Sequence, residues 1–255
     1  MKITLIQGNI QWNDPLENIR RMDDAMRHHA GTDLFVLPEM FATGFCIEPE
    51  KVAEAEGGLV HSWMRRRAGQ LNAAVAGSLA VKTEDGMFHN RFYLVEPNGT
   101  VSHYDKHHLF APGGEAKAYA PGAKRTIITY RGVRILPLVC YDLRFPVWAR
   151  YQQDYDLILC VAAWPAKRIG AWDTLLRARA IENQCYVAGV NCVGTYSQEQ
   201  YNGHSVLIDP RGRVLAEAPT DGLVCELSGV VDMEVVRSCR ESFPVWKDSD
   251  FFYLV

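Results

Sequence analysis

Ten short apolar runs recur along the sequence, and each is too short to be a typical helix. The runs are four to seven residues long and rich in Val, Ile, Leu and aromatic side chains, a composition that favours strands. Turn signals such as Pro97-Asn98-Gly99 and Pro210-Arg211-Gly212 separate several of them. The pattern predicts strands at 3–7, 34–37, 75–80, 92–96, 126–130, 133–139, 157–162, 186–190, 204–208 and 223–227.

Three segments between these runs have the periodicity of helices. The first begins after Asp14, a favourable N-cap followed by Pro15, and its apolar stripe passes through positions 16, 19, 22 and 26. The other two cover about 59–71 and 171–183. Strands that alternate with helices predict an α/β protein, and the hairpin-like pair 75–80 and 92–96 argues against an all-parallel sheet.

No linker or low-complexity segment interrupts the chain, so we expect one domain over residues 1–235 and a tail over 236–255. The tail ends in the sequence Asp-Phe-Phe-Tyr-Leu-Val. So many apolar side chains at a chain end predict a contact with the body or with a second subunit.

The charge balance and the cysteines limit the classes of partner. With 27 Lys and Arg against 30 Asp and Glu, the net charge is −3, so the chain lacks the excess of basic residues that is typical of nucleic-acid binding. No apolar stretch is long enough for a membrane span, and the first residues lack the apolar core of a signal peptide. The seven cysteines form no C-x-x-C pair, which argues against a disulfide framework or a structural zinc and favours a reducing, cytoplasmic setting.

Two residues at strand ends are candidates for chemistry. Cys140 ends the 133–139 run and precedes a Pro-initiated helix, so we expect it at a strand-to-helix turn near backbone N–H groups that stabilise a thiolate or an oxyanion. The alternative is a buried core thiol. Glu39 follows the apolar 34–37 run and Pro38, where partial desolvation suits a general base, although an exposed strand-end acid has the same pattern.

Two further charged residues lie in loops. Lys106 is a candidate for stabilising an oxyanion or for lowering the pKa of a thiol, and its alternative is a solvated loop lysine. Glu115 follows a flexible Gly pair and has the alternative of an ordinary loop acid. The pair His107-His108 lacks a third ligand at metal-binding spacing, while a Cys–His dyad stays open as an alternative.

Taken together, these segments resemble the catalytic motifs of the nitrilase superfamily of carbon–nitrogen hydrolases, with the omega-amidase branch the most similar. The order and the spacing also fit, since the lysine lies 67 residues after the glutamate and the cysteine 34 residues after the lysine. The resemblance covers about residues 1–235. The matching segments are Pro38-Glu39-Met40-Phe41, Tyr104-Asp105-Lys106-His107-His108-Leu109-Phe110 and Leu138-Val139-Cys140-Tyr141-Asp142-Leu143-Arg144-Phe145-Pro146.

The resemblance implies a four-layer α-β-β-α sandwich and a Glu–Lys–Cys triad. In that triad Glu39 is the base, Cys140 is the nucleophile, and Lys106 with the backbone N–H of Tyr141 holds the oxyanion. Glu115 matches a fourth acid of the family that positions substrate and Lys106. The resemblance implies no metal or organic cofactor, a thioester intermediate, and a homodimer or larger homo-oligomer.

Within the omega-amidase branch, the implied reaction is hydrolysis of the terminal amide of 2-oxoglutaramate or 2-oxosuccinamate to the 2-oxo dicarboxylate and ammonia. The substrate carboxylate needs a cation, and Arg144 is the candidate, with a structural ion pair to Asp142 as the alternative. Phe41, Tyr119 and Trp164 are candidates for the walls of the pocket, and each could equally be core.

Three other readings remain open. Another small aliphatic amidase, or an N-carbamoyl amino acid amidohydrolase, would use the same triad with a different pocket. A non-catalytic binding protein on the same fold is a second alternative, against which the intact acidic, basic and thiol residues argue. An unrelated Cys–His hydrolase would depend on Cys140 but not on Lys106.

Overall fold

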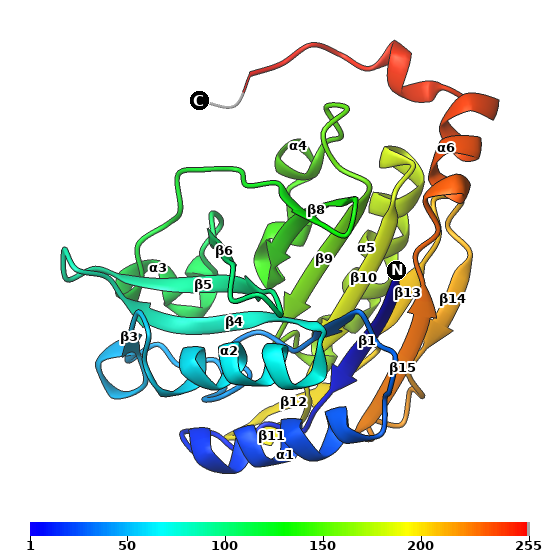
Figure 1. The fold of residues 1–255 in the computed structure, drawn as a ribbon. Coiled ribbons are helices and arrows are strands. Elements are labelled where there is room, and N and C mark those ends of the chain that lie inside the picture. Colours follow the sequence, from blue (N-terminus) through cyan, green and yellow to red (C-terminus); the bar gives the residue numbers. More distant parts are fainter. Residues whose placement is uncertain (254–255) are drawn as a thin grey trace.

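Two β-sheets face each other in the computed structural model, which describes residues 1–253 (Figure 1). In the first sheet β1 is parallel to β2 and β2 to β4, while β15, β5 and β6 run antiparallel to their neighbours. Its order is β15 (Cys225–Val230), β1 (Lys2–Gln7), β2 (Leu34–Val36), β4 (Ala74–Lys82), β5 (Phe88–Val95) and β6 (Val101–Asp105), with β3 (Glu54–Ala55) beside β4.

The second sheet has a parallel centre and antiparallel edges. Its order is β14 (Val214–Glu217), β13 (Val206–Ile208), β10 (Tyr186–Asn191), β9 (Leu157–Ala162), β8 (Val133–Val139) and β7 (Ile128–Tyr130). A separate hairpin of β11 (Val193–Tyr196) and β12 (Glu199–Asn202) follows β10.

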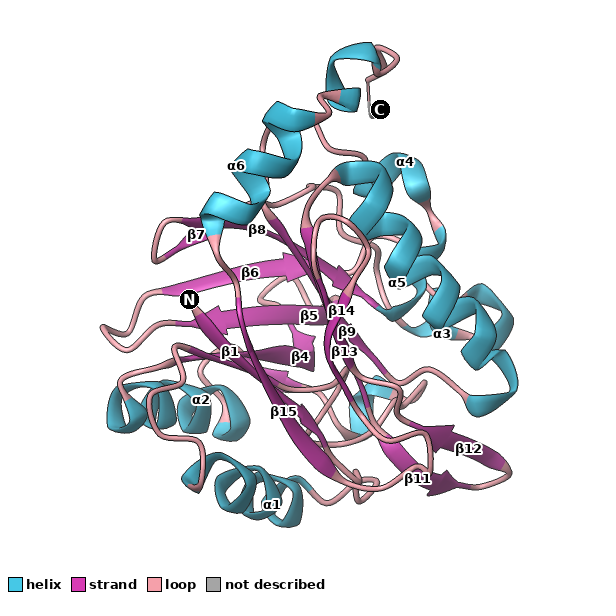
Figure 2. Cartoon of the chain, turned by 90° about the vertical axis from the view of Figure 1, so that its right-hand side faces the viewer, coloured by secondary structure: helices cyan, strands magenta, loops and turns pink. Residues whose placement is uncertain are grey.

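Helices cover both outer faces, which makes four layers (Figure 2). Helices α1 (Pro15–Arg27) and α2 (Leu59–Leu71) lie on the first sheet, and α5 (Ile169–Asn183) lies on the second. The predicted α-β-β-α sandwich is therefore confirmed. The shorter helices are α3 (Glu115–Ala118), α4 (Pro146–Ala149) and α6 (Met233–Ser242), and 3-10 turns lie at 49–51, 111–113, 140–144, 166–168 and 245–248.

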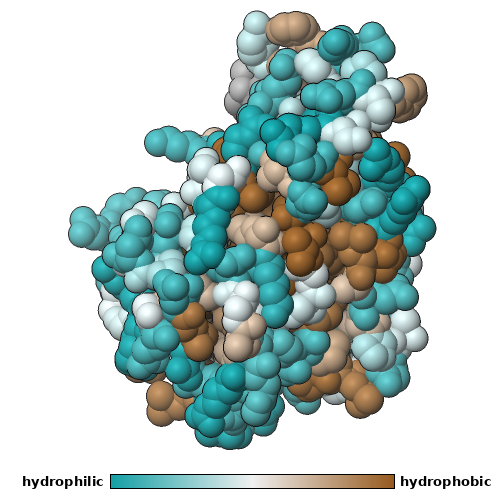
Figure 3. Space-filling view, turned by 45° about the vertical axis from the view of Figure 1, so that its right-hand side comes forward, coloured by the Kyte–Doolittle hydropathy of each residue, from teal (hydrophilic) through white to brown (hydrophobic). Residues whose placement is uncertain are grey.

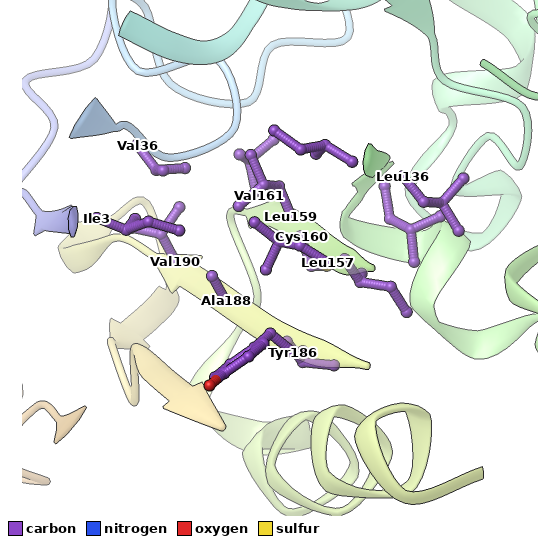
Figure 4. Close-up of a cluster of buried hydrophobic side chains, with 14 of the residues drawn as sticks. Ile3, Val36, Leu136, Leu157, Leu159, Cys160, Val161, Tyr186, Ala188 and Val190 are labelled. Atoms are coloured by element: carbon purple, nitrogen blue, oxygen red, sulfur yellow. The ribbon is translucent and has the colours of Figure 1, made fainter. Parts of the chain in front are cut away.

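The core fills the space between the two sheets. Ile3 and Val36 from the first sheet face Ala188 and Val190 from the second (Figure 4). Alternate residues of the first sheet, such as Ile6, point the other way and pack under α1 and α2. Burial of these two faces is the main favourable contribution to folding, at roughly 25 cal/mol for each Å² of apolar surface.

Each of the ten predicted strand segments overlaps a strand, and the three predicted helices are present. The first helix begins as expected, because the Asp14 side chain accepts a hydrogen bond from the N–H of Glu17 at 3.1 Å. The sequence patterns missed strands β3, β6, β11, β12 and β14 and helices α3 and α6, whereas the helix expected to begin at Pro146 is present as α4. Most of these elements are short or largely polar, so their apolar periodicity is weak.

The C-terminal segment begins as part of the body and then leaves it (Figure 1). Helix α6 crosses the predicted boundary at residue 235, and its Val236 and Cys239 are buried. Farther along, Phe251 and Tyr253 are 95% and 86% exposed, so residues 1–253 leave these two rings almost uncovered. The last two apolar residues of the predicted contact, Leu254 and Val255, lie outside the described residues.

Apolar side chains also gather on the face of the molecule that carries β14 and β15 (Figure 3). Leu215 of β14 and Val230 of β15 are 47% and 57% exposed. Among residues 1–253, no helix is long and apolar enough to cross a membrane.

Candidate active site

A cavity of about 310 Å³ opens where several strands end. Glu39 follows β2 and Lys106 follows β6 of the first sheet, whereas Cys140 follows β8 and Ala163 follows β9 of the second. The two sheets therefore bring the three predicted catalytic side chains to one place, although 101 positions separate the first from the last.

Cys140 lies at the turn that the sequence predicts. Its φ of +47° is left-handed, which is unusual for a residue with a side chain, and it begins the 3-10 turn that carries Tyr141. The N–H of Tyr141 belongs to the first turn and so has no acceptor within that turn. Both residues line the cavity. This geometry resembles that of other nucleophiles held on a strained strand-to-helix turn.

The Cys140 sulfur is a thiol at rest. Burial and the Glu39 carboxylate raise the pKa of Cys140 well above its ordinary value, and the Lys106 ammonium compensates only in part. Lys106 therefore lowers the pKa of the thiol, as one of its two predicted roles requires, but burial and Glu39 outweigh it. A base therefore has to take the thiol proton during attack. Glu39 is the carboxylate whose charge acts on Cys140, so it is the candidate for that base.

The buried side chains of Lys106, Glu39 and Glu115 form one charged cluster. The Nζ of Lys106 donates to Glu39 Oε1 at 2.8 Å and to Glu115 Oε2 and Oε1 at 2.8 and 3.1 Å. Burial alone would lower the pKa of Lys106, but the Glu115 and Glu39 charges raise it well above the ordinary value. Lys106 therefore stays a cation, and the cluster carries one more negative than positive charge.

The second carboxylate oxygen of Glu39 faces the other sheet. Its Oε2 accepts a hydrogen bond from the N–H of Ala163 at 2.9 Å. This leaves one lone pair on Oε2 for a proton from Cys140. Glu115 does not line the cavity, and its Oε2 also accepts from the N–H of Phe110 at 2.6 Å, so its contacts serve to hold Lys106 and the neighbouring loop.

The sequence analysis missed Asn90, which also belongs to this cluster. The Asn90 amide lies in β5 and donates to Glu39 Oε1 at 2.7 Å and to Glu115 Oε1 at 3.0 Å. The sequence signal was weak, because the predicted strand began at residue 92 and left the polar triplet His89-Asn90-Arg91 outside it.

The predicted pocket walls are partly wrong. Trp164 lines the cavity, but Phe41 and Tyr119 do not. Phe41 is fully buried on the outer face of the first sheet, 5.8 Å from the Trp63 ring, because the chain turns at Met40 with a φ of +43° and carries the next side chain away from the cavity. Tyr119 is buried with its hydroxyl donating to the carbonyl of Cys46 at 2.7 Å.

Arg144 lines the cavity and is not paired with Asp142. Its guanidinium lies 4.9 Å from the centre of the Trp164 ring, and it makes no hydrogen bond or ion pair with any of residues 1–253. Asp142 instead accepts bonds from the N–H of Val139 and from Tyr104 and His108. The alternative of an Arg144–Asp142 ion pair is therefore excluded, and the guanidinium is available to an anion.

Other residues of the wall were not anticipated. Lys167, from the turn before α5, forms an ion pair with Glu199 of β12, so its charge is compensated. Arg168 lies 5.2 Å from the Phe110 ring. Phe45, Phe110 and Tyr201 add aromatic surface, so the wall combines apolar rings with a few charged side chains. No three His, Cys, Asp or Glu side chains within residues 1–253 are grouped so that they could hold a metal ion.

Comparison with known proteins identifies the class. Residues 2–241 match the model of the carbon–nitrogen hydrolase family. The chain is 48% identical to the omega-amidase YafV of Escherichia coli K12, over 100% of this chain and 98% of that protein. It is 35% identical to a 2-oxoglutaramate amidase of Bacillus subtilis, over 96% of each chain.

The solved structures agree with this. A CN-hydrolase superfamily protein of Xanthomonas campestris, crystallised with an arsenic adduct in its active site, has a TM-score of 0.93 and 39% identity, covering 100% of this chain and 99% of that one. The chain belongs to the carbon–nitrogen hydrolase family, as its motifs predicted. It is therefore a hydrolase of amide C–N bonds.

Proposed function

We propose that this protein is an omega-amidase, which hydrolyses the terminal amide of 2-oxoglutaramate or 2-oxosuccinamate to the 2-oxo dicarboxylate and ammonia. The observation that carries the proposal is the Arg144 guanidinium, which has no ion-pair partner among residues 1–253 and lies in the same small cavity as Glu39, Lys106 and Cys140. The cavity suits a short amide with an anionic group at its other end. The names of the relatives from Escherichia coli and Bacillus subtilis support the same substrate class.

The first half of the reaction forms a thioester. Glu39 Oε2 takes the proton of the Cys140 thiol as Sγ attacks the amide carbon, and the carbonyl oxygen becomes an oxyanion. The Lys106 ammonium and the N–H of Tyr141 stabilise that oxyanion, and losing one such donor typically costs about 10²–10³ in rate. Glu39 then gives its proton to the departing nitrogen, the C–N bond breaks, and ammonia leaves.

The second half hydrolyses the thioester. Glu39, again a carboxylate, takes a proton from a water molecule whose oxygen attacks the thioester carbon. The same two donors hold the second oxyanion. Collapse breaks the C–S bond, the proton on Glu39 returns to sulfur, and the carboxylic acid product leaves.

Arg144 gives the substrate its orientation in this proposal. A guanidinium binds a carboxylate through two parallel hydrogen bonds, and the Trp164 ring, 4.9 Å from the guanidinium, supports it within the cavity. Arg144→Ala should raise KM for 2-oxoglutaramate by about 10–100-fold, since a hydrogen bond to a charged group contributes roughly 1.5–3 kcal/mol. A neutral aliphatic amide should be turned over by the variant at the wild-type rate.

The test measures ammonia release from 2-oxoglutaramate, an N-carbamoyl amino acid and a simple nitrile. Rapid turnover of the oxo-acid amide, lost in Cys140→Ala, supports the proposal. Turnover of another substrate alone would refute the assignment of the pocket and keep the triad. No turnover of any of them, with Cys140 still reactive, would favour the non-catalytic alternative.

A homodimer is part of the proposal. The exposed rings of Phe243, Phe251 and Tyr253 support it, because apolar side chains at a chain end are stabilised when a second subunit covers them. Light scattering of the full chain should give twice the mass of one chain. The double substitution Phe251→Ser and Tyr253→Ser should move the equilibrium toward the monomer, and an unchanged mass would refute a role for these rings.

A reducing compartment, the cytoplasm, is also proposed. All seven cysteines are unpaired, and the mechanism needs Cys140 as a thiol. Fractionation of cells that make the protein should recover it with cytoplasmic markers, and recovery from an oxidising compartment would contradict this placement.

A further inference from the structure

The amide of Asn90 occupies an unusual place between two carboxylates that share one cation. Its Nδ2 lies 2.7 Å from Glu39 Oε1 and 3.0 Å from Glu115 Oε1, while its Oδ1 is buried with no hydrogen-bond partner among residues 1–253. A buried acceptor without a partner costs free energy, so such a group calls for an explanation. The opposite orientation would direct Oδ1 at two carboxylate oxygens, so the two acids fix the amide as it stands.

The contacts of Lys106 suggest what the amide is for. The ammonium has three N–H bonds, and at rest all three serve the carboxylates of Glu39 and Glu115. The proposed mechanism needs one of these hydrogens to turn toward the oxyanion. The longest contact, 3.1 Å to Glu115 Oε1, ends on an oxygen that Asn90 also reaches. That oxygen keeps a donor when Lys106 turns away.

The main chain of Asn90 is tied to the same lysine. Its carbonyl accepts a hydrogen bond from the N–H of Lys106 at 2.9 Å, which continues the pairing of β5 with β6. One residue therefore fixes the backbone of Lys106 and the two acids that the side chain of Lys106 contacts. Asn90 itself does not line the cavity and so does not contact substrate.

We propose that Asn90 is a positioning residue that holds Glu39 and Glu115 in place while Lys106 turns one N–H toward the oxyanion. The proposal rests on the amidase mechanism above, and it does not depend on which amide is the natural substrate. It distinguishes two stages of the reaction. At rest Lys106 alone can hold both carboxylates, whereas during formation of the tetrahedral intermediate the donor from Asn90 is required.

The first test compares turnover with alkylation of the resting thiol. Asn90→Ala should lower kcat by about 10–100-fold with KM within twofold of wild type, because the residue acts through an oxyanion donor and does not contact substrate. Alkylation of Cys140 by iodoacetamide, followed by mass spectrometry to separate it from the other cysteines, forms no oxyanion and should stay within threefold. An alkylation rate that falls as far as kcat would refute the proposal, since Asn90 would then merely hold the resting site together.

The second variant keeps the shape and changes the donor. Asn90→Asp places a third carboxyl group beside Glu39, Glu115 and Lys106, with Cys140 across the cavity. Ionised, the new group donates nothing and repels both acids; protonated, it donates one hydrogen bond. The ratio of the variant's kcat to the wild-type kcat should therefore be at least fivefold higher at pH 6 than at pH 8.5. A ratio that does not change with pH would refute the role of the donor.

A matched control separates this role from the loss of any buried amide. Asn183 of α5 is buried and uses its amide to bond Arg179 and Tyr151, away from the cavity. Asn183→Ala should lower the melting temperature and leave kcat and its pH profile unchanged; a comparable loss of kcat would overturn the proposal. The kcat ratios are measured with 2-oxoglutaramate and with a simple aliphatic amide. Failure of the wild type on the first compound alone refutes the proposed substrate, not the role of Asn90.

Discussion

Asp142→Asn tests whether a single buried carboxylate joins the two halves of the active site. Asp142 lies in the turn after Cys140 and uses both of its oxygens. Oδ2 accepts from the N–H of Val139 at 3.0 Å and from the hydroxyl of Tyr104 at 2.8 Å. Oδ1 accepts from the N–H and the Nδ1 of His108, each at 2.9 Å. Burial and Asp142 raise the pKa of Tyr104, so its hydroxyl stays protonated as a donor.

The size of the effect follows from where the new amide nitrogen can point. Toward Tyr104 it finds no acceptor, because that hydroxyl already accepts from the N–H of His107 and from Nε1 of Trp148. Toward His108 it can donate to Nδ1 in the tautomer that carries its proton on Nε2. One donor, the N–H of His108, is then left without an acceptor, and the remaining bonds lose their charge. The unpaired N–H costs about 1–3 kcal/mol, and the weaker remaining bonds add to this cost. We therefore expect a loss of about 2–4 kcal/mol in the free energy of unfolding.

Urea unfolding of wild type and variant measures this loss directly, and the melting temperature should fall by roughly 4–16 °C. Turnover should fall as well, since the N–H of His108 belongs to the loop that carries Lys106. Asp209→Asn is the matched control. Asp209 is also buried, but both of its donors, the N–H groups of Arg211 and Arg213, bond to Oδ1 alone, which an asparagine oxygen replaces. Equal losses at the two sites would refute the reasoning.

Two further predictions concern stability. Gly203 and Gly132 both have a φ of +76°, but a Cβ at Gly203 would lie 2.2 Å from the Gln7 side chain, whereas nothing lies within 4 Å of one at Gly132. Gly132→Ala should therefore cost about 1–2 kcal/mol of backbone strain in urea unfolding, and Gly203→Ala about 1–3 kcal/mol more; equal costs would count against the steric argument. Burial raises the pKa of Cys192, so only the unfolded chain ionises there as the pH rises above about 8.5, and stability falls. Urea unfolding between pH 9.5 and 10.5 should show that the free energy of unfolding falls with pH less steeply in Cys192→Ala than in the wild type, by about 1.4 kcal/mol per pH unit. Equal slopes for the two proteins would contradict the assignment.

The sequence predicted the catalytic residues best where a charged or thiol side chain directly follows an apolar strand. The apolar runs located the centres of both sheets, and Glu39, Lys106 and Cys140 stood at or near the ends of runs or in matching motifs. The direction of a side chain after an irregular turn is a different matter. Phe41 follows Met40, which has a left-handed φ that a methionine does not predict. The prediction that Phe41 lines the cavity was therefore wrong.

Asn90 was missed for a related reason. A polar residue at the start of an apolar strand has the same pattern whether it faces solvent or a buried charge. What distinguishes Asn90 is the arrival of Glu39 and Glu115 from positions 51 and 25 residues away, and this depends on the packing of the fold. The same holds for Arg144, whose lack of a partner becomes visible only when Asp142 is seen bonded elsewhere.

The active site depends on the contact between the two sheets as much as on its own residues. Glu39 belongs to the first sheet, yet its Oε2 is held by the N–H of Ala163 and its own N–H approaches the carbonyl of Ala162 at 3.4 Å, both at the end of β9 in the second sheet. Tyr104 of β6 reaches Asp142, in the turn after β8 of the opposite sheet, in the same way. A relative shift of the sheets by 1 Å would break these bonds and move the base away from the nucleophile, since both are fixed to opposite layers. The close packing between the sheets therefore sets the catalytic distance, and a substitution there that leaves the fold intact can still remove activity.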